Sequence, residues 1–152
     1  MKSSFKNAFC GLFQHLKSER NMRIHLAFAF YVLIACAVTR ADPWEWTVCV
    51  ICVSAVIATE IFNTALERLC DFLHPGRSDV IKTVKDAAAG SVLIMAIGSA
   101  VVGGIVFFNR TKLDAVLSFI MDNKALTAAI LVTVPMVVYL VFRGYKNDKK
   151  DG

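Results

Sequence analysis

Four long apolar runs separated by short polar segments are the feature that most constrains how this chain can fold. The runs cover about residues 24–39, 44–73, 87–108 and 125–142. Of the 152 residues, 57% are apolar and 19% are charged, a balance that suits burial in lipid better than a soluble domain. We therefore expect an all-α fold, a polytopic membrane helix bundle.

The segment that precedes the first run is amphipathic instead of uniformly apolar. Between residues 4 and 19, Phe5, Phe9, Leu12 and Leu16 recur at spacings of three and four, with polar residues between them. This pattern predicts an N-terminal surface helix that lies in the membrane interface.

The lysine and arginine residues indicate how the runs are oriented. Thirteen of the 17 lie in segments that alternate to one side of the membrane, and four lie on the other side. Because positive residues are enriched in cytoplasmic loops, both termini and the loop at 73–86 are expected to be cytoplasmic. The net charge of +5 therefore reflects membrane orientation, and no nucleic-acid partner is expected.

A stripe of polar residues interrupts the second run. Glu60, Asn63, Thr64, Glu67 and Asp71 are offset by 0, 3, 4, 7 and 11, which places them on one face of a helix. At about 1.5 Å rise per residue, Glu60 lies roughly 16 Å deeper in the membrane than Asp71. An ionisable group at that depth is a functional candidate, although a carboxylate that only holds the bundle together would give the same pattern.

Other polar residues should lie at the cytoplasmic level where the stripe ends. Lys85 and Asp86 follow the short loop, and Glu19 ends the predicted surface helix. Carboxylates suit a hard divalent cation and lysine suits a phosphate, so a phosphate site is predicted there. A simply solvated acidic face is the alternative. The chain has no G-x-x-x-x-G-K-[ST] loop, so a phosphate would need to be held by another architecture.

Five stretches carry a resemblance to a known family: residues 8–12, 19–25, 45–46, 60–71 and 85–90. Their order resembles the prokaryotic diacylglycerol kinase family, especially its Gram-positive undecaprenol kinase branch. The most specific part is the run E-x-x-N-T-A-x-E-x-x-x-D followed by K-D-A-A-A-G. The resemblance implies transfer of the γ-phosphate of ATP to a lipid hydroxyl.

The same resemblance implies roles for individual residues. Glu60 matches the general base, and Glu19 and Glu67 match ligands of Mg²⁺. The residues that match the nucleotide-binding set are Glu19, Asn63, Glu67, Asp71, Lys85 and Asp86. The family also implies a homotrimer of three-span chains, with active sites shared between subunits, in the bacterial cytoplasmic membrane.

The fourth run departs from this three-span pattern. Residues 1–110 are expected to form the membrane lipid kinase domain, and 111–152 an additional transmembrane helix with a polar cytoplasmic tail. Pro135 lies within the additional helix and can kink it. This helix can lie outside a trimer core or contact a partner.

The identity of the acceptor lipid stays open at this point. The E-R-N-x-R-I-H and H-P signatures favour undecaprenol, with diacylglycerol as the alternative. A proton- or cation-conducting oligomer, with Glu60 and Glu67 in a pore and Lys85 tuning its selectivity, is a hypothesis from another class. A catalytically silent assembly protein would leave the joint occurrence of these polar residues without a reason.

Overall fold

The computed structural model describes residues 6, 19–76 and 78–143, and every regular element among them is helical. The elements are α2 (Arg20–Val38), α3 (Pro43–Leu73), α4 (Asp79–Phe107), α5 (Arg110–Asp122) and α6 (Lys124–Arg143). Helices α2, α3, α4 and α6 are long and apolar enough to cross a membrane. The predicted all-helical, polytopic fold is confirmed, while nearly all of the predicted surface helix lies outside the described residues.

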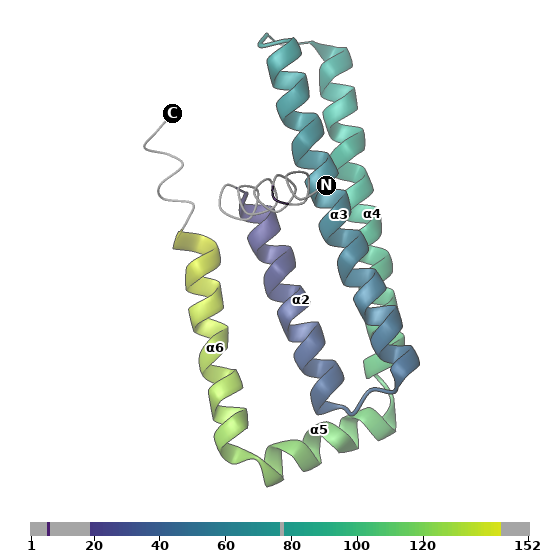
Figure 1. Ribbon diagram of the computed structural model, residues 1–152, viewed down its shortest axis with the longest axis vertical. Helices are drawn as coiled ribbons and strands as arrows, with labels where there is room; N and C mark the ends of the chain where they lie inside the picture. The colour runs from purple at the N-terminus through teal and green to yellow at the C-terminus, as the bar shows by residue number, and fades with distance from the viewer. Residues whose placement is uncertain (1–5, 7–18, 77, 144–152) are drawn as a thin grey trace.

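Helices α3 and α4 run side by side and form the largest helix–helix interface (Figure 1). Helix α2 packs against α3, and α6 lies on the other side of α2 (Figure 1). The 31 residues of α3 correspond to about 46 Å, well beyond the roughly 30 Å of a hydrocarbon core. The joined ends of α3 and α4 therefore project past α2, and the polar end of the stripe projects with them.

Local hydrogen bonds explain why α2 ends and α3 begins where they do. Arg40 has a φ of 51° and Ala41 N–H donates to the Cys36 carbonyl at 2.9 Å, so the C-terminus of α2 is a Schellman motif. At the start of α3 the Asp42 side chain accepts from Glu45 N–H, and the Glu45 side chain accepts from Asp42 N–H, each at 2.8 Å. This capping box, followed by a proline in the first helical position, fixes the reversal of the chain.

Helix α5 was not predicted from the sequence. It lies across the ends of the spans and joins α4 to α6 (Figure 1). Asn109 caps it, because the Asn109 side chain accepts from Lys112 N–H at 3.0 Å. This crossing helix returns α6 antiparallel to α4 and beside α2.

Helix α6 packs mainly against α2. The Tyr31 hydroxyl and the Thr133 hydroxyl lie 3.1 Å apart, and the Arg20 guanidinium lies over the Phe142 ring at 5.2 Å. Helix α6 continues through Pro135, although proline has no backbone N–H to donate within the helix. The fourth span is thus an integral neighbour of the first.

The exterior of the spans is apolar, unlike the exterior of a soluble protein. Large apolar side chains are exposed on every span, among them Phe28, Phe62, Ile94, Ile105 and Val132. Glu60, Asn63 and Thr64, by contrast, are buried between helices. Such an exterior suits lipid or further copies of the chain, while a few polar groups lie among the apolar residues of the interior.

Candidate functional site

The deeper part of the polar stripe of α3 is buried where α2, α3 and α4 meet, whereas Asp71 at its other end is exposed. The exposed fractions are 2% for Glu60, 6% for Asn63 and 2% for Thr64. The Thr64 hydroxyl donates to the Glu60 backbone carbonyl at 3.1 Å, so it is satisfied within the helix. The Glu60 carboxyl is therefore enclosed by protein at a depth where lipid could not solvate it.

Helix α2 supplies the neighbours of the Glu60 carboxyl. The Nε2 atom of His25 lies 3.9 Å from the Glu60 Oε2 atom, and the Asn21 side chain hydrogen-bonds with Glu60. Sequence reasoning missed Asn21 and His25 as site residues. Their spacing of four places both on one face of the helix that begins after Glu19, and this spacing could have identified them from the sequence.

A polar pocket of about 220 Å³ opens beside this carboxyl. Asn63 donates through Nδ2 to Glu67 Oε1 at 3.3 Å, while its Oδ1 atom is buried without a hydrogen-bond partner among the described residues. An unsatisfied buried acceptor suits a donor from a bound molecule. The lining residues are Asn21, His25, Glu60, Asn63, Ala89, Val92, Leu93 and Ala96.

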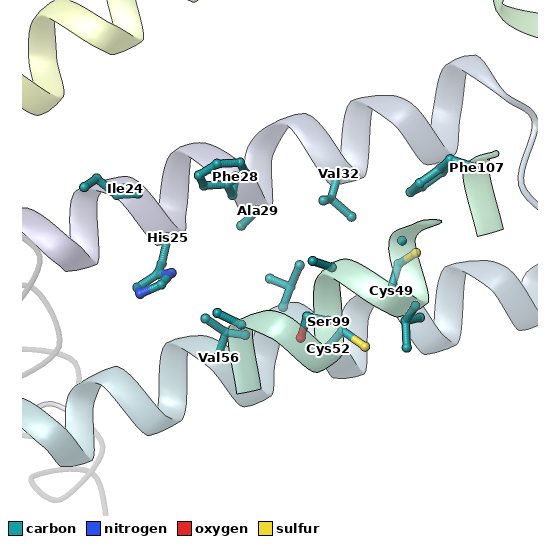
Figure 2. A pocket seen from close by; sticks show the side chains of 15 residues that line it. Ile24, His25, Phe28, Ala29, Val32, Cys49, Cys52, Val56, Ser99 and Phe107 are labelled. Carbon is teal, nitrogen blue, oxygen red and sulfur yellow. The ribbon is translucent and has the colours of Figure 1, made fainter. Parts of the chain in front are cut away.

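An apolar groove of about 320 Å³ adjoins the polar pocket and also lies among α2, α3 and α4. Figure 2 shows the His25 ring directed from α2 towards α3 at one end of the groove, with Cys49 and Phe107 at the other end. His25 and Ala96 line both the groove and the polar pocket. An apolar chain in the groove would thus present its polar end to Glu60.

Two ion pairs extend the site towards the end of the bundle where α3 and α4 project. Lys85 Nζ lies 2.9 Å from Asp71 Oδ1 and joins α4 to α3. Arg68 lies 3.1 Å from Glu19 Oε1 and joins α3 to the start of α2. Arg68 is a further residue that sequence reasoning missed, because its partner lies 49 positions earlier in the chain.

The predicted site residues are therefore partly assembled within one chain. Glu60 and Asn63 line the polar pocket, and Glu67 is bonded to Asn63 without lining the pocket itself. Glu19 and Glu67 lie close enough for their charges to interact with Glu60. Asp71 and Lys85 pair nearer the end of the helix, and Asp86 is exposed on α4 without lining the pocket.

The donor chemistry fits a magnesium ion that arrives with a nucleotide. Among the described residues, no cluster of three or more His, Cys, Asp or Glu is arranged to hold a metal. Mg²⁺ commonly uses only one or two protein carboxylates and completes its shell with water and phosphate oxygens. Glu67 and Glu19 are carboxylates of this kind near the pocket.

Comparison with known proteins complements this geometry. The family model for prokaryotic diacylglycerol kinase matches residues 6–107. An undecaprenol kinase from Bacillus subtilis (strain 168) is 32% identical over 107 residues, which cover 70% of this chain and 87% of that protein. A diacylglycerol kinase from Synechocystis is 35% identical over 103 residues, which cover 66% of this chain and 58% of that protein. No solved structure matches the chain.

Proposed function

The chain belongs to the prokaryotic diacylglycerol kinase family and is a multi-pass membrane lipid kinase with ATP as phosphate donor, and we propose that its acceptor is the hydroxyl of undecaprenol. The observation that carries this proposal is the junction of a polar pocket, which contains Glu60, with an apolar groove between the same helices. The hydroxyl would enter the pocket while the chain behind it occupies the groove.

Glu60 serves as the general base in this proposal. As the lipid oxygen forms its bond to the γ-phosphorus, the carboxylate of Glu60 takes the hydroxyl proton and the bond to ADP breaks. Burial of the carboxyl keeps the attacking oxygen away from bulk water, which would otherwise compete as the acceptor. The depth of Glu60 also matches a hydroxyl anchored by a chain that lies within the membrane.

The nucleotide would bind on the same face nearer the cytoplasm. Glu67 and Glu19 would hold Mg²⁺, which when bound neutralises charge on the phosphate oxygens. Lys85 would exchange its partner Asp71 for a phosphate, since both side chains reach solvent. Asn63 and Asp86 would complete the polar shell around the nucleotide.

The groove favours a polyprenol over diacylglycerol. Apart from cysteine thiols, its only polar lining residues among the described ones are His25 and Ser99. Diacylglycerol carries two ester carbonyls close to its hydroxyl, and a buried polar group without a partner costs about 1–3 kcal/mol. A polyprenol carries no such carbonyl. The relative named undecaprenol kinase agrees with this choice, and the relative named diacylglycerol kinase makes diacylglycerol the alternative acceptor.

The proposal includes the assembly and location of the protein. Residues 1–110 form the kinase domain, and 111–152 add a span and a tail. A homotrimer with shared active sites is supported by the apolar faces that the spans leave exposed. The bacterial cytoplasmic membrane, with both termini on the cytoplasmic side, is supported by the distribution of lysine and arginine.

Two isosteric substitutions test the assignment of roles. Glu60→Gln should lower phosphate transfer by at least about 100-fold and leave nucleotide binding unchanged, because only the base is removed. Glu67→Gln should also weaken binding of Mg-ATP. The measurements are phosphate transfer from labelled ATP and nucleotide binding by equilibrium dialysis on folded protein. Full activity in both variants would refute the site.

A further inference from the structure

His25 occupies the point where the two cavities meet. Among the described residues only His25 and Ala96 line both the polar pocket and the apolar groove, so His25 is the polar group at their junction. Its ring points from α2 towards α3 (Figure 2). The His25 side chain is 18% exposed and the Glu60 side chain is 3% exposed, so a molecule in the groove meets the imidazole before the carboxyl.

The separation of His25 from Glu60 leaves room for one bridging atom. The distance of 3.9 Å between Nε2 and Oε2 exceeds the roughly 2.7–3.2 Å of a direct hydrogen bond. A single oxygen can nevertheless lie within hydrogen-bonding distance of both atoms. A carboxylate has about four acceptor sites, so Glu60 can accept a further donor beside the side chain of Asn21.

We propose that His25 binds the acceptor lipid by donating a hydrogen bond from Nε2 to the hydroxyl oxygen, while the hydroxyl proton faces Glu60. This inference rests on the proposed function and adds a specific contact to it. The ligand class is an alcohol at the end of an apolar chain. The bond from His25 occupies one lone pair of the hydroxyl oxygen and holds this oxygen beside Glu60, so that another lone pair can attack the phosphorus.

A purely structural histidine would behave differently from a hydroxyl-binding one. If His25 only packed the bundle, its loss would affect both substrates alike through folding. If it holds the hydroxyl, its loss affects the lipid selectively, and a side chain that keeps a donor at the same reach restores much of the function. The amide of glutamine offers such a donor, and leucine offers none.

The kinetic experiment compares His25→Leu with His25→Gln in mixed micelles. For His25→Leu we expect kcat/KM for undecaprenol to fall about 10- to 30-fold, while the KM for ATP stays within about twofold. His25→Gln should recover most of that loss. The control is Thr59→Val, since Thr59 lines neither cavity and, among the described residues, its hydroxyl bonds only the Ala55 carbonyl of its own helix. Equal losses towards lipid and ATP without rescue by glutamine would overturn the inference.

A binding measurement without ATP separates this inference from the proposed kinase activity. The probe is farnesol, with farnesene as the analogue that lacks the hydroxyl oxygen. The protein is labelled with ¹⁵N at its three histidines, and the Nε2 resonance of His25 is identified as the one missing from His25→Gln. Adding farnesol should shift this resonance. Farnesene should shift it less, because it has no oxygen to accept the bond from His25. No shift would overturn the His25 contact even in an active enzyme, whereas a shift in a protein that phosphorylates neither lipid would overturn only the proposed function.

Discussion

Lys112 Nζ lies 2.5 Å from Glu45 Oε2, and this ion pair ties the first turn of α5 to the first turn of α3. The same Glu45 oxygen accepts Asp42 N–H in the capping box. Both side chains of the pair are mostly buried, with 11% of Lys112 and 18% of Glu45 exposed. Because Lys112 lies beyond the residues that the family model matches, the pair couples the additional segment to the kinase helices.

Loss of that lysine should destabilise the bundle. Lys112→Ala leaves the Glu45 carboxylate poorly compensated, and we expect a loss of about 2 kcal/mol in the free energy of unfolding. Lys124→Ala is the control, since Lys124 is exposed and forms no ion pair within the described ranges. Thermal unfolding in detergent, followed by circular dichroism, measures both. Equal melting temperatures for the two variants would show that the pair contributes nothing.

Arg40 holds the left-handed position of the Schellman motif that ends α2. A non-glycine residue pays about 1 kcal/mol there, so Arg40→Gly should raise the melting temperature. Ala41→Gly adds the same freedom to the unfolded chain without relieving strain, and it should lower the melting temperature. A lower melting temperature for Arg40→Gly would contradict the assigned conformation.

Two threonines of α6 should respond differently to the same substitution. Thr133→Val removes the bond to the Tyr31 hydroxyl and should cost about 0.6 kcal/mol, typical of interhelical bonds in membranes. The Thr127 hydroxyl oxygen is buried without a partner among the described residues, so Thr127→Val should be neutral or stabilising. Chemical unfolding in mixed micelles compares them. A larger loss of stability for Thr127→Val than for Thr133→Val would contradict the described packing of α6.

Lys85 should affect nucleotide binding more than stability. Lys85→Met removes the cation proposed to contact phosphate, and we expect the KM for ATP to rise about tenfold with the melting temperature unchanged. Lys82→Met, one turn earlier on α4, is the matched control, because Lys82 is exposed and has no ion pair within the part of the chain described. The same KM in both variants would remove Lys85 from the nucleotide site.

Much of the fold follows from local sequence. Each predicted apolar run coincides with a candidate span, to within one residue at the C-terminal end, because the length and apolar composition of a run indicate a membrane helix. The third run was predicted over 87–108, yet α4 begins at Asp79 because a helix need not stop where lipid ends. Helix α5 was missed because it is too short and too polar to form a span, although Leu113, Val116 and Leu117 have helical spacing. Its position depends on the pair of Lys112 with Glu45, which lies 67 positions earlier in the chain. Pairing at that range depends on tertiary structure.

Part of the candidate site could also be predicted from local sequence, and part depends on how the helices pack. Glu60, Asn63 and Glu67 share a face by helical spacing, so their grouping could be predicted from one segment. The contact between His25 and Glu60 requires α2 to pack against α3 in a particular register, which no periodicity within either helix specifies. The ion pair between Arg68 and Glu19 also depends on how α3 packs against the start of α2, so the sequence pattern does not predict it.

The most direct test of the proposed function is phosphate transfer from labelled ATP by purified protein in mixed micelles. Undecaprenol and diacylglycerol are offered separately, each with and without Mg²⁺. The account predicts preferential labelling of undecaprenol that requires Mg²⁺. Preferential labelling of diacylglycerol would contradict the assigned acceptor, and labelling of neither lipid by folded protein would contradict the account as a whole.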